Sequence, residues 1–261
     1  MGYFSEKTIW ITGASSGIGE ALAKELSKDG AKLILSARRE NELVRVQQAC
    51  AHPEKVKILP LDLEQHEQAD DWVKKAWGLF GGIDGLVNNG GVGQFGDSLE
   101  TDDHVERKLF EVNYFGNVAL TKRLLPKMLE AQKGQIMAIS SIAGKFGQAK
   151  LAAYSASKGA LTLYYESLKE ELYHTPVKIQ VVSPGFIQTS VTLNSLKPDG
   201  SKMNKNSPAQ ENGMPARVFA KKLKKVMQGS KFHRYIGRKE LLAVPIHTVW
   251  PSAFYKLIRK N

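Results

Sequence analysis

The chain has 261 residues, of which 42% are hydrophobic and 24% charged, the composition of an ordinary globular protein and not of a disordered one. Its single cysteine, Cys50, excludes an intramolecular disulfide and a cysteine-based metal site, and we expect no metal. The net charge of +11 is concentrated late in the chain, because Lys197–Lys239 holds twelve lysines and arginines against two acids. Such a region favours contact with an anionic surface, and a solvated helix face is the alternative.

The length predicts one domain spanning residues 1–261, since α/β folds of this size commonly form a single unit. The first ten residues lack the basic stretch and long apolar run of a secretory signal. No run approaches the ~18 apolar residues that span a bilayer. With one cysteine, these features lead us to expect a cytoplasmic protein.

Short apolar runs alternate with segments of helical spacing along most of the chain. The predicted strands are Lys7–Thr12, Lys32–Ala37, Val56–Leu61, Ile83–Asn88, Gln135–Ser140, Val177–Ser183 and Phe232–Ile236. The predicted helices are Gly19–Lys28, Glu40–Ala51, Glu67–Leu79, His104–Glu130 and Ala153–Tyr173. Alternation of this kind predicts an α/β fold, a parallel sheet with helices on both faces.

The alternation fails between Ser190 and Pro215, where turn signals such as Lys-Pro-Asp-Gly and Asn-Gly gather. A loop this long within a compact domain is usually functional. It follows the strand that ends at Ser183, so we expect a substrate lid over about 190–215, covering the carboxyl edge of the sheet where ligands bind in such folds.

Three glycines follow the first predicted strand, within Thr12-Gly13-Ala14-Ser15-Ser16-Gly17-Ile18-Gly19, and a helix comes next. Glycines allow a tight turn and close approach of a diphosphate, and a helix N-terminus offers free N–H groups. The spacing G-x-x-x-G-x-G differs from the usual fingerprint G-x-G-x-x-G, so a plain glycine-rich turn is the alternative. The position at the start of a strand-helix-strand unit favours dinucleotide binding.

The second predicted strand leads into Arg38 and Arg39, where sites for NAD usually place an acid that binds the ribose hydroxyls. A guanidinium fork suits a 2′-phosphate. The pair therefore predicts NADP(H), and surface arginines at a helix start are the alternative.

Tyr154 and Lys158 are four residues apart, at the start of a predicted helix, and so lie on the same helix face. A free tyrosine has a pKa near ~10. A neighbouring ammonium favours the phenolate and would lower that pKa toward neutrality, where acid-base catalysis is most efficient.

Further motifs are Asn88-Asn89-Gly90-Gly91 after the fourth strand, Ser140-Ser141 after the fifth, and Pro184-Gly185-Phe186-Ile187-Gln188-Thr189 after the sixth. Together with the glycine turn and the Tyr154/Lys158 pair, this set resembles the short-chain dehydrogenase/reductase family over essentially the whole chain. The resemblance implies a doubly wound Rossmann fold with a seven-stranded parallel sheet.

The same resemblance implies catalytic roles for four residues. Tyr154 would donate or accept the proton while the nicotinamide carries the hydride, and Lys158 would hold the nicotinamide ribose and lower the Tyr154 pKa. Ser141, thirteen residues before Tyr154, would bind the substrate oxygen, with Ser140 as the competing serine. Asn113, in Asn113-Tyr114-Phe115-Gly116, would anchor a water leading to Lys158, and a helix-kink residue bonding its own backbone is the alternative.

The turn, the arginines and the resemblance also place a set of residues around the cofactor. These are Gly13, Ser15, Ser16, Gly17, Ile18, Gly19, Arg38, Arg39, Asp62, Leu63, Asn89, Gly90, Tyr154, Lys158, Pro184, Gly185 and Thr189. Asp62 would receive the adenine amine, and Thr189 the carboxamide. The family usually has Asn-Asn-Ala-Gly, so Gly90 is expected to loosen that strand end slightly.

Apolar residues recur at helical spacing near the C-terminus, with lysines between them, which predicts an amphipathic helix with a basic face. The apolar positions are Phe219, Leu223, Val226 and Met227, and the basic ones are Lys221, Lys222, Lys224 and Lys225. Beyond it, in an extension of about 239–261, the apolar segment Leu241–Ile258 is broken by Pro245 and Pro251. Such a segment can lie peripherally on a membrane, or it can pack on a second subunit or over the active-site cleft. The extension resembles that of the "member 7" dehydrogenase/reductases and related hydroxysteroid reductases, which implies a bulky, lipid-like carbonyl substrate.

The sequence therefore predicts an NADP(H)-dependent carbonyl reductase, and the resemblance implies a homodimer or homotetramer. A non-catalytic dinucleotide-sensing or scaffold protein is the alternative, against which the complete set Asn113, Ser141, Tyr154 and Lys158 argues. Nucleic acid is not an expected partner, because aromatic residues do not interleave with the basic ones as they do in nucleic-acid platforms.

Overall fold

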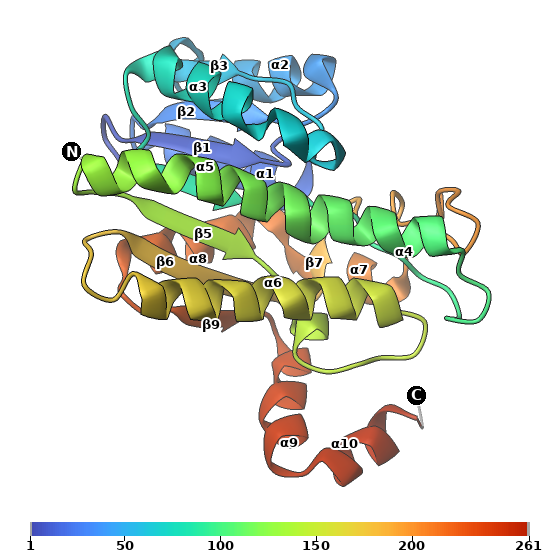
Figure 1. The fold of residues 1–261 in the computed structure, drawn as a ribbon. Helices are drawn as coiled ribbons and strands as arrows, with labels where there is room; N and C mark the ends of the chain where they lie inside the picture. The colour runs from blue at the N-terminus through green and yellow to red at the C-terminus, as the bar shows by residue number, and fades with distance from the viewer. Residues whose placement is uncertain (1, 260–261) are drawn as a thin grey trace.

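The computed structural model describes residues 2–259 and contains a seven-stranded sheet in the order β3-β2-β1-β4-β5-β6-β9, parallel throughout (Figure 1). The strands are β1 Thr8–Thr12, β2 Lys32–Ser36, β3 Val56–Ile58, β4 Gly85–Asn88, β5 Gln135–Ile139, β6 Lys178–Pro184 and β9 His233–Ile236. Each of the seven predicted strands is confirmed, with β3 shorter than expected. The sheet, flanked by helices, is the predicted doubly wound Rossmann arrangement.

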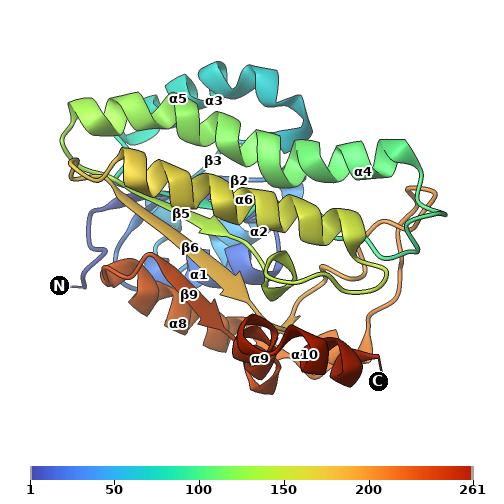
Figure 2. The same cartoon turned by 60° about the horizontal axis from the view of Figure 1, so that its bottom comes forward.

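Helices cover both faces of the sheet (Figures 1 and 2). One layer comprises α1 Gly17–Ser27, α2 Glu40–Gln48 and α8 Ala216–Gln228. The other comprises α3 Ala69–Phe80, α5 Gly116–Glu130 and α6 Ala152–Glu171. Successive residues of one strand enter different cores: Ile9 and Ile11 pack with the first layer, and Trp10 with the second. Burial on both faces explains why these strands are apolar throughout.

The predicted helix over His104–Glu130 is interrupted. It consists of α4 Asp103–Phe110, a π-helical turn η3 Glu111–Phe115, and α5. The Asn117 Nδ2 donates to the carbonyls of Val112 and Asn113, both at 3.0 Å, within this turn. Single π turns inside α-helices occur frequently at functional sites.

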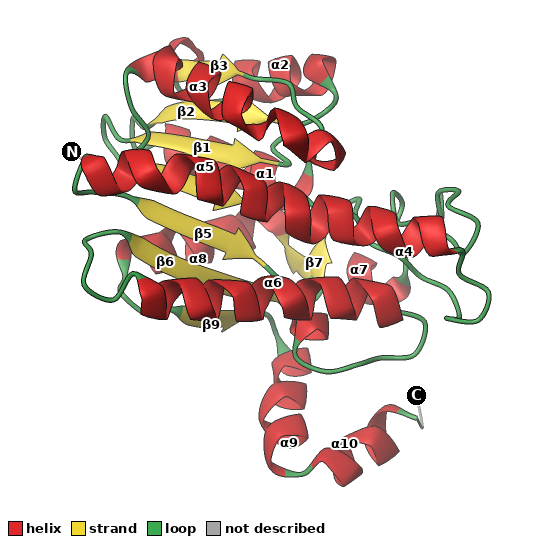
Figure 3. Ribbon diagram, in the orientation of Figure 1, coloured by secondary structure: helices red, strands yellow, loops and turns green. Residues whose placement is uncertain are grey.

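The connections after the strands gather at the carboxyl edge of the sheet (Figure 3). The short elements of the chain are η1 Pro53–Lys55, η2 Leu63–Gln68, η4 Ile142–Gly144, β7 Ile187–Gln188, α7 Pro208–Glu211, β8 Met214–Pro215, η5 Lys239–Leu242, α9 Ala243–Val249 and α10 Pro251–Ile258. The strand order reverses between β1 and β4, and ligands of open α/β sheets bind outside such a switch point.

The C-terminal quarter contains α8, which packs on the core, and two shorter helices, α9 and α10, each of which has a proline in its first turn. In α8, the predicted apolar positions Phe219, Leu223 and Met227 are buried, and Lys224 pairs with Asp29 on the turn after α1 at 3.0 Å. Proline is tolerated at the position it has in α9 and α10. Residues 260–261 of the predicted extension lie outside the described residues. Between residues 2 and 259, none of the helices is both long and apolar enough to cross a bilayer.

Candidate functional site

The glycine turn joins β1 to α1 and leaves the helix N-terminus open. Gly13 and Gly17 have φ of 62° and 58°, in the left-handed region that favours glycine. Ser16, in extended conformation at the N-cap, makes no side-chain capping bond. The first N–H groups of α1 are therefore free of a side-chain cap and suited to an anion.

The loop after β4 is tied directly to this turn. The Asn89 Nδ2 donates to the carbonyls of Thr12 at 2.9 Å and Gly13 at 3.2 Å. In return, the Thr12 hydroxyl accepts from the N–H groups of Asn89 and Gly90. The structure thus brings the predicted residues Gly13, Asn89 and Gly90 together, with the Asn89 side chain bonded to backbone.

Gly90 lies against Leu63, and this contact bears on the expectation of a loosened strand end. A methyl group added at Gly90 would lie 2.5 Å from Cδ1 of Leu63. Leu63, which is buried, already occupies the space that the alanine of the usual motif would fill. This packing argues against the expected loosening, because a neighbouring side chain fills the gap.

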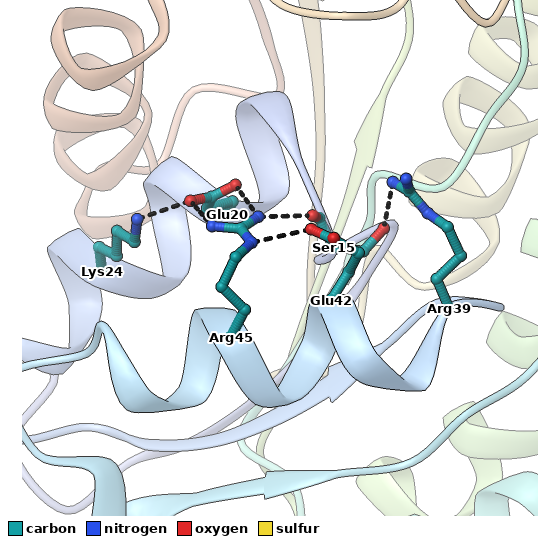
Figure 4. A network of polar contacts seen from close by, with 6 residues as sticks. All are labelled: Ser15, Glu20, Lys24, Arg39, Glu42 and Arg45. Carbon is teal, nitrogen blue, oxygen red and sulfur yellow. Dashed lines mark hydrogen bonds and ion pairs between the residues drawn. The ribbon is translucent and has the colours of Figure 1, made fainter.

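Arg38 and Arg39 lie exposed between β2 and α2, and Arg39 reaches the glycine turn. Its Nη2 lies 3.4 Å from the Ser15 hydroxyl (Figure 4). Arg39 and Ser15 thus lie together at the glycine turn. Asp62, half-buried at the start of η2, accepts from the Glu64 N–H at 3.2 Å.

A further arginine beside the turn had no signal in the sequence. Arg45 of α2 donates to both carboxylate oxygens of Glu20 at 2.8 Å and to the Ser15 carbonyl at 3.2 Å (Figure 4). Hydrogen bonding from Arg45 lowers the pKa of Glu20 to about 2, although burial opposes the shift. Glu20 and Arg45 are 25 residues apart, so spacing along one helix could not have paired them.

Tyr154 and Ser141 meet beyond the end of β5. Burial raises the pKa of Tyr154, and a hydrogen bond with the Ser141 side chain opposes that rise. The predicted lowering by Lys158 is not found. Lys158 is 4% exposed on the same helix, and its ammonium donates instead to the Ile139 carbonyl at 2.9 Å. Burial lowers the pKa of Lys158 to about 8.

Asn113 lies fully buried in the π turn. Its Oδ1 accepts from the Val92 N–H at 2.8 Å, and its Nδ2 donates to the Val92 carbonyl at 2.9 Å and to the Ser157 hydroxyl at 3.1 Å. A methyl group at Gly91 would lie 3.0 Å from the Asn113 Oδ1 and 3.3 Å from the Lys158 Nζ. The absence of a side chain at Gly91 thus lets both Asn113 and Lys158 approach the same backbone position.

The two neighbouring serines have different partners. Ser140, buried at the strand end, donates to the Lys158 carbonyl at 2.9 Å and contacts the Thr162 hydroxyl. Ser141 accepts from the Ala143 N–H and meets Tyr154. This arrangement favours Ser141 as the serine available to a substrate.

The segment after β6 lies beside the glycine turn and the loop after β4. A methyl group at Gly17 would lie 3.1 Å from Thr189, and the Thr189 hydroxyl accepts from Gln210 at 3.2 Å. Farther on, the Leu196 N–H donates to the Gly93 carbonyl, and its carbonyl accepts from the Phe95 N–H, both at 2.9 Å. Most of 190–215 is irregular, and these bonds dock it onto the loop after β4.

The C-terminal extension packs on the loop that follows Ser141. Phe254, 1% exposed, forms a cluster with Ile142 and Phe146, and the Phe146 and Phe254 rings are 4.6 Å apart. At the start of the extension, Glu240 accepts from the N–H groups of Phe186 at 3.1 Å and Arg238 at 3.0 Å. Pro184 and Gly185, the predicted cofactor residues at the end of β6, lie directly before this contact.

A model of the short chain dehydrogenase family matches residues 7–199. The chain belongs to this family. A dehydrogenase/reductase SDR family protein 7-like from Anopheles gambiae is 36% identical over 99% of this chain and 84% of its own length. A family member 7B from Xenopus tropicalis is 33% identical over 98% of this chain and 85% of its own length.

Solved structures of similar proteins share the fold. A short-chain dehydrogenase from Streptomyces avermitilis superposes with a TM-score of 0.84 at 28% identity, over 98% of this chain and 97% of that one. An enzyme of the family from Burkholderia phymatum in complex with NAD has a TM-score of 0.85 at 24% identity, over 95% of each chain. A serine dehydrogenase complexed with NADP+ has a TM-score of 0.80 at 21% identity, over 88% of this chain and 94% of that one. The same fold is therefore found with NAD bound in one of these proteins and with NADP+ bound in another.

Proposed function

We propose that the protein is an NADP(H)-dependent oxidoreductase that interconverts a carbonyl and a secondary alcohol, acting as a reductase on an apolar, lipid-like carbonyl. The observation that carries the proposal is the buried Tyr154, whose pKa the Ser141 side chain lowers against the effect of burial, one helical turn from the buried Lys158. Membership of the short chain dehydrogenase family supports it.

The residues at the carboxyl edge fit a nicotinamide dinucleotide. The uncapped N-terminus of α1 and the two left-handed glycines suit a diphosphate. Arg38 and Arg39, with the Ser15 hydroxyl, suit a 2′-phosphate. Asp62, Leu63 and the end of β6 through Thr189 would complete the cofactor site. The bound dinucleotide would supply or accept the hydride.

Tyr154 would supply the proton that the carbonyl oxygen receives in the reduction. Because burial raises its pKa, Tyr154 holds its proton at neutral pH and can donate it to a carbonyl oxygen in the reducing direction. Ser141 would donate a hydrogen bond to the same oxygen. As the proton leaves, the positive charge of Lys158 would stabilise the phenolate. Asn113, whose side chain bonds the Val92 backbone and Ser157, would hold the surrounding elements in register.

An apolar substrate is supported by the loops around this edge. Phe95, Phe186 and Val191 remain 38–44% exposed on the segments that follow β4 and β6. Apolar side chains left exposed on loops beside a site favour an apolar ligand. The segment 190–215, docked at Leu196, would act as the substrate lid.

The cofactor proposal is tested by replacing Arg38 with Asp. We expect the preference, measured as the ratio of kcat/KM for NADPH and NADH, to shift toward NADH, because the acid repels a 2′-phosphate and accepts from ribose hydroxyls. Arg234→Asp, at an exposed position on the edge strand β9, is the matched control. An unchanged ratio in Arg38→Asp would overturn the preference, and a wild type that binds neither dinucleotide would overturn the function. Binding without turnover of any carbonyl would favour the scaffold alternative.

We also propose that the protein works in the cytoplasm as a homodimer or homotetramer, with its C-terminal helices in peripheral contact with a membrane. Leu242, Val249 and Trp250 are 64–82% exposed around α9. Sedimentation with anionic vesicles, lost in Trp250→Ala, would support membrane contact. If the wild-type protein does not sediment with the vesicles, and Trp250→Ala lowers the mass of the protein measured in solution, the extension packs on a second subunit instead.

A further inference from the structure

Arg45 joins three pieces of chain that meet at the proposed cofactor site. Its guanidinium donates to both oxygens of Glu20 on α1, to Glu42 on its own helix, and to the carbonyl of Ser15 in the glycine turn (Figure 4). The Glu20 contacts form a two-pronged carboxylate pair, the geometry in which arginine binds most strongly. A side chain of α2 therefore fixes the start of α1 and the turn before it.

A contact such as that of Arg45 with the Ser15 carbonyl restricts the conformational freedom of the glycine turn. Ser15 lies between Gly13 and Gly17, both with positive φ. Glycine loses more backbone freedom on folding than any other residue, so a turn built on two of them is costly to hold in one conformation. Ser15 is held from two sides, at its carbonyl by Arg45 and at its hydroxyl by Arg39.

Arg45 also neutralises the Glu20 carboxylate, whose negative charge would oppose the binding of a diphosphate. Glu20 lies in the first turn of α1, the end that would receive the diphosphate. Its carboxylate is bound by Arg45 and by Lys24 at 2.6 Å. Without Arg45, Glu20 and Glu42 would leave one excess negative charge beside Lys24, and a diphosphate would be repelled.

We propose that Arg45 is a positioning residue for the dinucleotide: it holds the glycine turn in its binding conformation and neutralises Glu20. This inference rests on the proposed function. Arg45 acts on the part of the site that receives the diphosphate, which NADPH and NADH share. It therefore sets the affinity for both cofactors alike, whereas Arg38 and Arg39 discriminate between them.

The test compares Arg45→Gln and Arg45→Lys with the wild type, by titration of NADPH and NADH in a calorimeter. Because the lost bonds are charge-assisted but half-exposed, we expect Arg45→Gln to raise the Kd of both cofactors by the same factor, about fivefold. Arg45→Lys keeps the charge but loses the fork, and we expect at least about a twofold rise for both. Arg123→Gln, which removes an exposed pair with Asp70, is the matched control and should bind as the wild type does.

A second readout needs no cofactor. Hydrogen exchange at the amides of residues 14–20 should be faster in both Arg45 variants than in the wild type, and unchanged in Arg123→Gln. If Arg45→Gln does not fold, Arg45→Lys alone decides both measurements. Adding Glu20→Gln to Arg45→Gln should restore part of the affinity, since it removes the carboxylate left without its partner.

Wild-type affinities in Arg45→Lys and Arg45→Gln would overturn the inference, and so would a loss for NADPH alone, which would make Arg45 a ligand of the 2′-phosphate. If the proposed function itself fails, the outcome is different, because the wild type then binds neither dinucleotide. In that case the role of Arg45 in holding the turn would still be overturned if hydrogen exchange at residues 14–20 were the same in the Arg45 variants as in the wild type.

Discussion

Lys158 is only 4% exposed, and its ammonium donates a hydrogen bond to the Ile139 carbonyl. Burial lowers the pKa of this ammonium to about 8. The unfolded chain keeps this proton up to about 10.5, so between pH 8 and 10.5 the unfolded state binds more protons than the folded one. Stability contributed by this group therefore rises with pH across that window. At neutral pH the buried Lys158 ammonium remains charged, and its burial therefore lowers the free energy of unfolding.

We predict that Lys158→Met is more stable than the wild type at pH 7, by about 1–2 kcal/mol, and that the difference shrinks at pH 10. The removed desolvation cost is on the order of 3 kcal/mol, and the lost hydrogen bond to Ile139 offsets about 1 kcal/mol. Urea unfolding at the two pH values measures this. Lys221→Met, exposed on α8, is the control. A Lys158→Met protein less stable than the wild type at pH 7 would contradict the assignment.

Gly90 and Leu63 form a matched pair at the end of β4. We predict that Gly90→Ala lowers the free energy of unfolding by about 1–2 kcal/mol, because its methyl group would overlap Leu63 Cδ1. Leu63→Val in the same chain should restore part of that loss by making room. Gly147→Ala, where a methyl group meets nothing within 4 Å, should change stability little. Additive effects of Gly90→Ala and Leu63→Val in denaturant unfolding would refute the pairing.

At the scale of elements, the C-terminal helices are attached to the catalytic end of the molecule by few contacts. Phe254 packs with Ile142 and Phe146, which follow Ser141 directly in the chain. Glu240 bonds the Phe186 N–H on the segment after β6. The extension thus supports two loops of the proposed site from outside.

We predict that Phe254→Ala releases α9 and α10, so that limited proteolysis cuts within 243–259 at least about tenfold faster. Removing a buried aromatic ring costs about 3–5 kcal/mol, more than a small satellite cluster can absorb. Trp250→Ala, 68% exposed in the same segment, should be cut at the wild-type rate. Equal cutting rates for Phe254→Ala and the wild type would show that the cluster does not hold the extension.

Some elements could be predicted from the sequence, and others could not. The strands were predictable because burial on both faces requires continuous apolar runs such as Leu33–Leu35. The π turn at Asn113 has a helical pattern on both sides and so is hidden within one long predicted helix. The docking of Leu196 on Gly93 joins residues about a hundred positions apart, and periodicity carries no such information.

At the scale of the whole molecule, the family and fold followed from motifs, whereas the charges of the site did not. The sequence placed Tyr154 and Lys158 on one helix face, but the direction of the Tyr154 pKa shift is set by burial, which the Ser141 side chain only partly opposes. Likewise, Arg38 and Arg39 were evident from their place after a strand, whereas Arg45 reaches the turn from a separate helix. Substrate identity depends on loops whose sequence is irregular.

The central claim is that Tyr154 supplies the proton for reduction of a carbonyl by NADPH. The most direct measurement is NADPH consumption against a panel of ketones, aldehydes, steroids and quinones, by the wild type and Tyr154→Phe, with NADPH binding measured for both. We predict that at least one carbonyl supports turnover, that Tyr154→Phe lowers kcat by about a hundredfold or more, and that NADPH binding is retained. Wild-type turnover in Tyr154→Phe would contradict the claim.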